Sequence, residues 1–183
     1  MDWVIREATA IDAASIARVN VDSWRTTYVN IVPQSYLDSL SYEQRTTRWQ
    51  GVLSDSTSLW FTYVAENVDG NIIGFAGGGP ESSGNEVFTG ELGWIYLLKE
   101  YQRQGIGRKL MAKVVLRLNQ QGHSSILVWV FTANPYKSFY EALGGRPVGE
   151  REVDKYGANL VEIAYGWQDL SIFTEILESD TTF

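Results

Sequence analysis

A turn between an apolar strand pattern and an amphipathic helix pattern has the residue types to bind an anion. The turn spans residues 102–107, Gln-Arg-Gln-Gly-Ile-Gly; it follows the apolar residues 94–98 and precedes a helical pattern that begins at Arg108. The first N–H groups of a helix have no partner within the helix, and Gly105 and Gly107 have no Cβ to keep a ligand away from them. The pattern therefore predicts that this turn binds a diphosphate.

Two common nucleotide-binding motifs do not fit this turn. A Walker A loop needs Gly-x-x-x-x-Gly-Lys-Ser/Thr, and the sequence has no such run. A Rossmann fingerprint needs a third small residue three positions after the second glycine, and Leu110 stands there. A second glycine-rich stretch, residues 77–84, precedes a strand pattern and not a helix, so we interpret it as a hairpin loop.

The composition indicates one domain with its own core. The 183 residues are 44% hydrophobic, which excludes a disordered chain, and no repeat or linker divides them. We expect a single domain over residues 1–183, with residues 168–183 as a C-terminal tail in which a last helix is one option. The formal net charge of −7 disfavours nucleic acid as a partner and mildly favours a cationic substrate.

Missing residue types exclude several kinds of chemistry. The chain has no cysteine, so thiol catalysis, disulfides and cysteine-based zinc sites are excluded. Its one histidine, His123, follows Gly122 at a predicted helix end, where we interpret it as a surface residue and not as a catalytic or metal-binding group. No apolar run is long enough to span a membrane and no signal-peptide pattern opens the chain, so we expect a cytoplasmic protein without a membrane partner.

Hydrophobic periodicity and turn residues predict the elements around the diphosphate turn. Thr9 and Asp12 resemble a capping box that opens the first helix, and Asp69-Gly70 indicates a hairpin. Gly51 is the predicted end of the third helix, which begins near Ser41. The predicted strands are residues 3–7, 59–66, 71–77, 87–98, 125–131, 148–153 and 160–167. The predicted helices lie at 13–28, 41–51, 108–122 and 135–143, and a further helix has Pro33 in its first turn.

These features together resemble the GNAT family of acyl-CoA-dependent N-acetyltransferases. The family signature is Arg/Gln-x-x-Gly-x-Gly/Ala at a strand-to-helix turn, and Gln102, Gly105 and Gly107 match it. Residues 134–144, Asn-Pro-Tyr-Lys-Ser-Phe-Tyr-Glu-Ala-Leu-Gly, look like the second motif of the family, and the element order agrees over nearly the full length. The resemblance implies an α/β (α+β) fold with a central mixed, mostly antiparallel, twisted sheet of six to seven strands, flanked by helices, with one splayed strand pair.

The resemblance also implies acetyl-CoA as the cofactor. Backbone N–H groups of the turn and the positive end of the helix dipole would hold the pyrophosphate of coenzyme A. The preceding strand would pair with the pantetheine arm, and Asn134 would contact the cofactor or cap its own helix. Lys99 and Arg103 depart from the family, which often has proline and glycine there, and we expect neither to need a positive φ. The implied cofactor-binding residues are Tyr96, Leu97, Gln102, Arg103, Gln104, Gly105, Ile106, Gly107, Arg108 and Asn134.

Acetyl transfer needs a neutral amine, a polarised thioester carbonyl and a proton for the departing thiolate. An amine with a pKa of ~10.4 is neutral in only about one molecule in ~10³ at pH 7 and needs a general base, whereas an amine near ~8 hardly does. The resemblance implies that Glu91 is this base; a salt-bridge role for Glu91, or Glu86 in its place, is the alternative. It implies that Tyr140 donates the proton to the sulfur, with core packing as the alternative, and we expect the N–H of Leu97 to polarise the carbonyl.

Aromatic residues of the first helices and of the last turn are the expected acceptor site. Trp24, Tyr28 and Tyr156, together with Tyr36, would suit an amine of apolar or cationic character, and core or dimer packing is the alternative. The resemblance thus implies acetyl transfer to a primary amine of a small molecule or peptide in a ternary complex. A non-catalytic acyl-CoA-binding or regulatory module is the alternative function. An acyl donor longer than acetyl, and a homodimer, both stay open.

Overall fold

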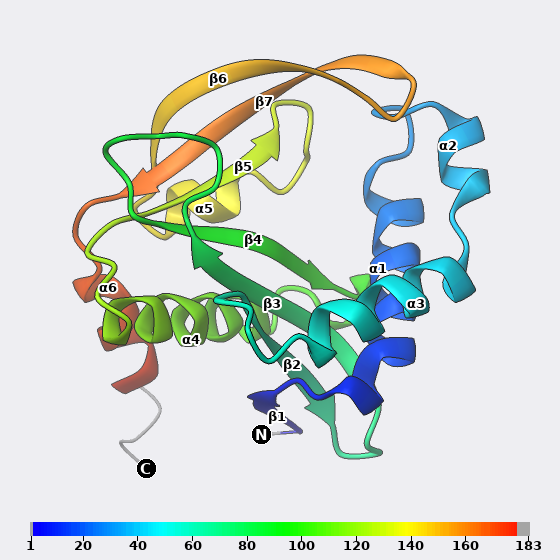
Figure 1. Cartoon of the computed structure of the whole chain (residues 1–183), viewed down its shortest axis with the longest axis horizontal. Helices are drawn as coiled ribbons and strands as arrows, with labels where there is room; N and C mark the ends of the chain where they lie inside the picture. The colour runs from blue at the N-terminus through cyan, green and yellow to red at the C-terminus, as the bar shows by residue number, and fades with distance from the viewer. Residues whose placement is uncertain (1, 179–183) are drawn as a thin grey trace.

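A seven-stranded sheet with helices on both faces makes up the structure, a computed structural model that describes residues 2–178 (Figure 1). The strand order is β1-β2-β3-β4-β5-β7-β6, and all neighbours are antiparallel except β4 and β5, which are parallel. The strands are β1 (Trp3–Glu7), β2 (Phe61–Asn67), β3 (Ile72–Pro80), β4 (Gly90–Leu97), β5 (Ile126–Phe131), β6 (Arg146–Lys155) and β7 (Ala158–Trp167). The predicted fold class, a mixed and mostly antiparallel sheet, is confirmed.

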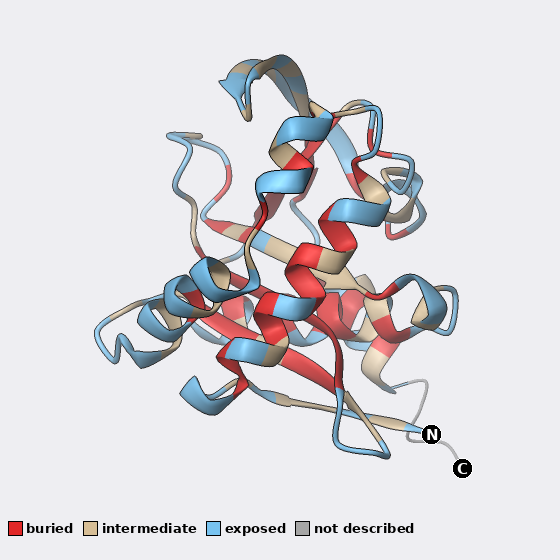
Figure 2. Ribbon diagram, turned by 90° about the vertical axis from the view of Figure 1, so that its right-hand side faces the viewer, coloured by how far each residue is buried: buried red, intermediate tan, exposed pale blue. Residues whose placement is uncertain are grey.

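The first three helices pack on one side of the sheet and the last three on the other (Figures 1 and 2). Within residues 2–178, no helix has the length and apolar character needed to cross a bilayer. A capping bond precedes α1, because the N–H of Thr9 donates to the carboxylate of Asp12 at 2.8 Å. The helices are α1 (Ala13–Thr27), α2 (Gln34–Ser39), α3 (Tyr42–Ser54), α4 (Ile106–Gln120), α5 (Ser138–Ala142) and α6 (Ser171–Glu178), with short 3₁₀ turns η1 (Ala10–Asp12) and η2 (Lys99–Tyr101).

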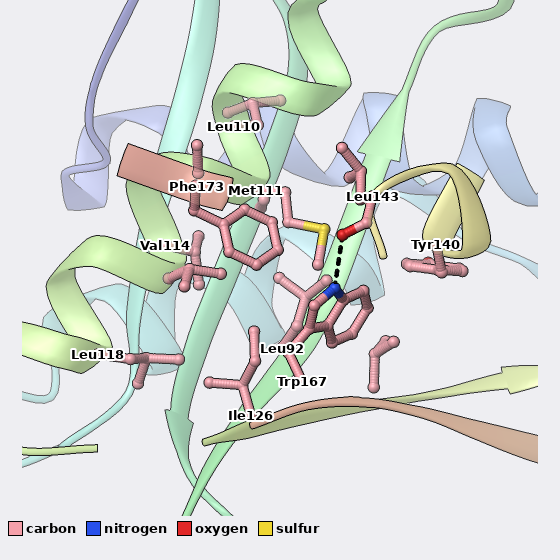
Figure 3. Close-up of a cluster of buried hydrophobic side chains, with 14 of the residues drawn as sticks. Leu92, Leu110, Met111, Val114, Leu118, Ile126, Tyr140, Leu143, Trp167 and Phe173 are labelled. Atoms are coloured by element: carbon pink, nitrogen blue, oxygen red, sulfur yellow. Dashed lines mark hydrogen bonds between the residues drawn. The ribbon is translucent and has the colours of Figure 1, made fainter. Parts of the chain in front are cut away.

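The largest core lies between α4 and the sheet (Figure 3). The predicted apolar stripe of α4 is fully buried there: Leu110, Met111, Val114, Val115 and Leu118. Trp167 closes this core next to α5, where its indole N–H donates to the carbonyl of Leu143 at 2.8 Å (Figure 3). This buried bond fixes the end of α5, and with it the position of the second family motif.

The glycine-rich stretch is not the loop that the sequence predicted. Its first residues, 77–80, belong to β3, and only the residues after Pro80 form the loop to β4. A Cβ at Gly77 would overlap the indole of Trp94, and a Cβ at Gly79 would overlap that of Trp60. The two indoles stack with their centroids 5.3 Å apart, so this strand needs glycine to make room for them.

The predicted end of α3 at Gly51 is also wrong, because the helix continues to Ser54. Gly51 is exposed, and a Cβ there would meet nothing within 4 Å. The residues after it, Val52 and Leu53, pack against the core that α1 and α3 share. This burial outweighs the unfavourable helix propensity of one glycine, which is about 1 kcal/mol. The start of α3 is as predicted, since Ser41 Oγ accepts the N–H of Gln44 at 3.3 Å.

The hairpin predicted at Asp69-Gly70 is confirmed, and a second hairpin joins β6 to β7. Gly70, between β2 and β3, has a φ of 79°. The turn between β6 and β7 consists of Tyr156 and Gly157, with φ values of 61° and 77°, as two-residue hairpins require. In the predicted C-terminal tail the structure places α6, and residues 179–183 of that tail lie outside the described residues.

Candidate cofactor and acceptor site

A gap opens in the middle of the sheet between β4 and β5. The two strands pair at only two positions, Gly90 with Ile126 and Glu91 with Leu127. Beyond them β4 continues along β3 and β5 continues along β7, so the two strands diverge (Figure 1). The last residues of β4, Ile95–Leu97, are only half-buried although they lie in the centre of the sheet. The splayed strand pair is therefore confirmed.

Backbone groups of β4 face this gap at alternate residues. The N–H of Leu98 donates to the carbonyl of Ile73 in β3 at 3.0 Å. Since successive N–H groups of a strand point to opposite sides, the N–H groups of Leu97 and Ile95 point away from β3 and into the gap. The backbone N–H and carbonyl groups of Tyr96 point toward β3. Ile95 and Leu97, and not Tyr96 and Leu97 as predicted, are therefore the residues of β4 whose backbone groups face the gap.

The chain reverses between β4 and α4 through two residues in the left-handed region. Gly105, the N-cap of α4, has a φ of 84°, and Arg103 has a φ of 64°. The expectation that Arg103 needs no positive φ is therefore wrong. A left-handed conformation costs a non-glycine residue roughly 1–2 kcal/mol, which explains why glycine is frequent at this position in the family.

The first turn of α4 has the N–H groups that a diphosphate needs. The first bond within the helix runs from the N–H of Lys109 to the carbonyl of Gly105 at 3.2 Å. The N–H groups of residues 106–108 therefore have no acceptor within the helix, and a glycine N-cap has no side chain to accept from them. A Cβ at Gly105 would meet nothing within 4 Å, which leaves space above these groups. The residues present thus fit the diphosphate of coenzyme A.

Two other predicted cofactor residues hold the loop itself. The N–H of Gln102 donates to the carbonyl of Lys99 at 3.2 Å, and its side-chain amide donates to the carbonyl of Leu97 at 3.2 Å. The side chain of Gln104 donates to the carbonyl of Glu100 at 3.1 Å. Gln102 therefore connects the end of β4 to the start of the turn at residues 102–108, which we call the cradle. Contact of the Gln102 N–H with a ligand would require breaking its hydrogen bond to the carbonyl of Lys99.

Tyr140, on α5, is buried on the α4 side of the sheet. Its ring stacks on that of Tyr165, with centroids 5.8 Å apart and an interplanar angle of 22°, and its edge faces Trp167. Burial raises the pKa of Tyr140 well above its ordinary value, and the neighbouring Tyr96 hydroxyl raises it further. Within residues 2–178 its hydroxyl has no hydrogen-bond partner. Tyr140 is thus a neutral donor whose proton is available to a ligand.

Tyr96 approaches the same gap from the other face of the sheet. The indole N–H of Trp24 in α1 donates to the hydroxyl of Tyr96 at 3.1 Å. Burial raises the pKa of Tyr96 to about 12, against an opposing effect of this hydrogen bond. The Tyr96 hydroxyl also raises the pKa of Tyr140, so the two hydroxyls lie close enough to interact electrostatically. The Tyr96 side chain packs on the α1 side of the sheet and Tyr140 on the α4 side.

The three predicted acceptor residues come together on the Tyr96 side. We call them, with Tyr36 and Phe131, the aromatic cluster. Trp24 lies 4.6 Å from Tyr28 and 5.1 Å from Tyr156, measured between ring centroids. Tyr156 lies 4.7 Å from Tyr36, and Tyr28 lies 5.6 Å from Phe131 of β5. Trp24 and Tyr28 are buried, while Tyr36 and Tyr156 are half-exposed, so the cluster is a packed layer with an accessible tyrosine edge.

Glu91 lies at the closed end of the gap, on the same face as the aromatic cluster. The adjacent Leu92 packs toward α4, so Glu91 points to the opposite face. Its Oε2 accepts hydrogen bonds from the N–H and the hydroxyl of Ser82, at 3.0 and 2.8 Å. Its Oε1 has no partner among residues 2–178 and can accept a proton. The competing Glu86 is exposed on the loop before β4, and the role of Glu91 as base stays a prediction.

Asn134 and His123 have structural contacts. The side-chain oxygen of Asn134 accepts the N–H of Tyr136 at 2.8 Å, which caps the turn that leads into α5. The cofactor role of Asn134 stays a prediction. His123 follows the end of α4, and its N–H donates to the carbonyl of Leu118 at 3.0 Å.

The sequence reasoning missed a charged pair on the acceptor face. Arg151 of β6 pairs with Glu162 of β7 at 2.7 Å, and the Arg151 guanidinium lies 4.0 Å from the ring centroid of Trp129 in β5. Glu162 stands between two apolar residues of a predicted strand, and this interruption of the apolar pattern was the available signal. Its partner was not predictable, because the partner depends on the register of the β6–β7 hairpin.

Comparison with known proteins identifies the family. A family model described as the acetyltransferase (GNAT) family matches residues 20–144, more than half of the chain. A curated protein described as the uncharacterized N-acetyltransferase YuaI of Bacillus subtilis is 44% identical over 173 residues, which are 94% of this chain and 97% of that protein. The chain belongs to the GNAT acetyltransferase family.

Solved GNAT structures share the fold and contain the cofactor. The PaiA N-acetyltransferase of Thermoplasma acidophilum, in complex with coenzyme A, matches with a TM-score of 0.66 and 23% identity, over 91% of this chain and all of that chain. A phosphinothricin acetyltransferase of Sinorhizobium meliloti, in complex with acetyl-CoA, matches with a TM-score of 0.66 and 21% identity, over 91% and 88% of the two chains. Acetyl-CoA is accordingly the cosubstrate of this GNAT protein.

Proposed function

We propose that this GNAT protein transfers the acetyl group of acetyl-CoA to a primary amine of a small molecule or peptide, by direct attack in a ternary complex. The observation that carries the proposal is the divergence of β4 from β5, which pair at only two positions. The neutral hydroxyl of Tyr140 lies on one side, and Tyr96 and the aromatic cluster lie on the other. Two ligands can therefore meet in the gap without a covalent enzyme intermediate.

Each residue has one task in this mechanism. The N–H groups of residues 106–108 hold the diphosphate, and the N–H of Leu97 donates to the thioester carbonyl oxygen as negative charge develops there. The carbon–nitrogen bond forms as the carbon–sulfur bond breaks. Glu91 would accept the proton that the amine loses, directly or through water, and Tyr140 would donate a proton to the departing sulfur. Tyr140 would then regain a proton from solvent, and Glu91 would release its proton to solvent.

Thiol release tests the proposal. The purified protein is incubated with acetyl-CoA and a panel of primary amines, and free coenzyme A is measured with a thiol reagent, while calorimetry measures the binding of coenzyme A alone. Amine-dependent release supports the proposal. Binding of coenzyme A without release for any amine would instead identify a non-catalytic acyl-CoA-binding module. Competition among acetyl-, propionyl- and butyryl-CoA in the same assay determines the acyl preference.

The cradle has its own prediction. Gly107→Val should weaken coenzyme A binding by at least ~10-fold, about 1.4 kcal/mol, because the branched side chain narrows the space between α4 and Phe139. A Cβ at Gly107 would already lie 3.4 Å from the Phe139 ring, an ordinary contact that the fold tolerates. Gly51→Val, at a helical position with no neighbour within 4 Å, is the matched control and should bind coenzyme A normally. Unchanged affinity in a folded Gly107→Val protein would contradict the proposed cradle.

A further inference from the structure

An arginine of α3 faces the aromatic cluster. Arg45 is half-buried in the first turn of this helix, and its Nη2 donates to the hydroxyl of Tyr36 at 3.1 Å. The Tyr36 ring in turn lies 5.7 Å from Trp24 and 4.7 Å from Tyr156, measured between centroids. The Arg45 guanidinium is therefore attached directly to the accessible edge of the predicted acceptor site.

This guanidinium is balanced by no carboxylate. Among residues 2–178, no acidic group lies within ion-pairing distance of Arg45 or of its neighbour Arg48. The carboxylate across the cluster, that of Glu162, is 13% exposed and already paired with Arg151 at 2.7 Å. The unbalanced fixed charge at the α3 edge of this site is positive, although the whole chain has a formal net charge of −7.

The positive charge acts on the groups at the gap. Burial raises the pKa of Tyr156, and Tyr36 and Glu162 raise it further, while the charges of Arg45 and Arg48 oppose this rise. Arg45 likewise opposes the rise in the pKa of Tyr96, which lies at the gap itself. The α3 edge of the aromatic cluster therefore favours negative charge, whereas the carboxylate of Glu91 lies at the closed end of the gap.

A half-buried guanidinium with only a neutral partner is incompletely satisfied. Its planar donors match the two oxygens of a carboxylate, and such charge-assisted hydrogen bonds are about twice as strong as neutral ones. The bond to the Tyr36 hydroxyl uses one donor of Nη2 and fixes the direction of the side chain. The remaining donors are available to a ligand that lies against the aromatic cluster.

We propose that the acceptor amine carries its own carboxylate, as an amino acid does, and that Arg45 binds this carboxylate while the amino group lies at the gap. This inference rests on the proposed acetyl transfer and narrows its substrate class. The net charge of the chain mildly favours a cationic substrate. This inference instead gives the substrate a negative group, because the charge of Arg45 is opposite in sign to the charge of the whole molecule.

Matched pairs of amines test the inference. Tyrosine is compared with tyramine, phenylalanine with phenethylamine, and lysine with cadaverine, so that each pair differs only in the carboxylate. The value of kcat/KM is measured by thiol release, and the equilibrium affinity for each amine is measured by calorimetry on protein saturated with coenzyme A. In at least one pair we expect the carboxylated member to be preferred by about 10- to 100-fold in both measurements, the range of a charged hydrogen bond.

Variants separate recognition from structure. Arg45→Gln should remove the preference by raising KM for the carboxylated member only. Tyr36→Phe keeps the arginine charge and removes its neutral partner, so it should keep most of the preference. Arg25→Gln is the matched control, since Arg25 bonds the carbonyl of Leu40 and the hydroxyl of Tyr42 away from the gap.

The outcomes are distinct. Thiol release without a preference for any carboxylated member would overturn the inference and leave the proposed acetyl transfer intact. Equal losses for both members of a pair in Arg45→Gln would also overturn it, because they indicate a structural role. If no amine in the panel supports thiol release, acetyl transfer to such amines is wrong, and the calorimetric arm alone decides whether Arg45 binds a carboxylate.

Discussion

Tyr140 is buried beside Tyr165 and Trp167, and this burial determines which proton transfer its hydroxyl can perform. Desolvation disfavours the phenolate, so the pKa rises and the side chain stays protonated at every pH at which the protein is expected to act. A neutral phenol beside the gap can donate to a departing thiolate, whose conjugate acid has a pKa near ~8.5. It cannot serve as a base, and that role must fall to another group.

The first prediction at this scale is that Tyr140→Phe lowers kcat by roughly 10- to 100-fold and leaves the affinity for coenzyme A nearly unchanged. The phenylalanine ring preserves the stack on Tyr165 and removes only the donor. Thiol-release kinetics and calorimetry measure the two quantities. Tyr136→Phe, at an exposed tyrosine in the same motif, is the control and should have no effect. Wild-type turnover in Tyr140→Phe would remove this residue from the mechanism.

The second prediction concerns Glu91. Glu91→Gln keeps an oxygen for the hydrogen bonds from Ser82 and cannot accept a proton. We expect turnover to fall by about 10- to 100-fold for amines with a pKa near ~10.4 and to change little for amines near ~8, which are already partly neutral. Glu86→Gln is the matched control. A loss that does not depend on the pKa of the amine would indicate that Glu91 only positions the Ser82 loop.

Residues within a motif were predictable from the sequence, and residues paired across the fold were not. Tyr140 and the glycines of the cradle lie at fixed spacings within short motifs. The role of Arg45 depends on the packing of α3 on the aromatic cluster, and the role of Glu162 depends on the register of the β6–β7 hairpin. Neither arrangement follows from local sequence, because both depend on contacts between elements.

At the scale of elements, periodicity located the seven strands and the first five helices but not all of their ends, and it left α6 as one option. The glycine-rich end of β3 was predicted as a loop because glycine and proline normally mark turns. This end of β3 forms a strand because the indoles of Trp60 and Trp94 pack over its glycines, which have no side chains of their own. These contacts come from residues 17 or more positions away in the chain, which a reading of local propensity does not include.

The divergence of β4 from β5 has an element-level cause. The register of β3 and β4 shifts between Gly77 and Gly78, so Gly93 of β4 is an extra residue without a partner. A bulge increases local twist, and this one lies just beyond the last position at which β4 and β5 pair. A Cβ at Gly93 would overlap the ring of Trp60. The bulge therefore turns the end of β4 away from β5 and opens the gap.

The prediction at this scale concerns the turn after α5. A Cβ at Gly145 would lie 2.5 Å from the indole of Trp167 and 2.8 Å from the carbonyl oxygen of Tyr140. Gly145→Ala should therefore lower the free energy of unfolding by about 1–3 kcal/mol, the usual cost of overpacking. It should also lower kcat, because α5 moves and displaces the Tyr140 hydroxyl. Urea unfolding and thiol-release kinetics measure the two effects.

Gly51→Ala is the matched control for this substitution. The methyl group would meet nothing within 4 Å in an exposed helix, so stability should rise by about 0.5–1 kcal/mol with kcat unchanged. A Gly145→Ala protein as stable and active as the wild type would show that the turn can relax without moving α5.

At the scale of the whole molecule, the local charge at the proposed binding regions is opposite in sign to the net charge of the chain. The chain has a formal charge of −7, yet the first turn of α4 and the α3 side of the aromatic cluster both carry positive groups. The helix dipole and Arg108 supply the first region, and Arg45 and Arg48 supply the second. The net charge therefore bears on the solubility of this protein, whereas the local arrangement of charged groups bears on which ligands it binds.

The buried tyrosines around the gap give the molecule a predictable response to alkaline pH. Burial raises the pKa of each tyrosine in this group above its ordinary value: Tyr28, Tyr96, Tyr140, Tyr156 and Tyr165. In the unfolded chain they titrate near ~10, so above that pH the unfolded state binds fewer protons than the folded state. Stability is therefore fully present below about pH 10 and falls as pH rises through the folded-state values, by up to ~1.4 kcal/mol per pH unit for each tyrosine.

Urea unfolding followed by tryptophan fluorescence, at a series of pH values from about 8 to about 11, measures this slope. Tyr28→Phe removes one buried titrating group whose hydroxyl has no hydrogen-bond partner among residues 2–178, so it should reduce the slope by about one proton without a large loss of stability at neutral pH. Tyr136→Phe, at an exposed tyrosine, should leave the slope unchanged. A urea midpoint that stays constant up to about pH 11 would mean that these tyrosines ionise in the folded protein as easily as in the unfolded chain. The gap between β4 and β5 would then be far more hydrated than their burial indicates, and burial would not determine the protonation state of Tyr140.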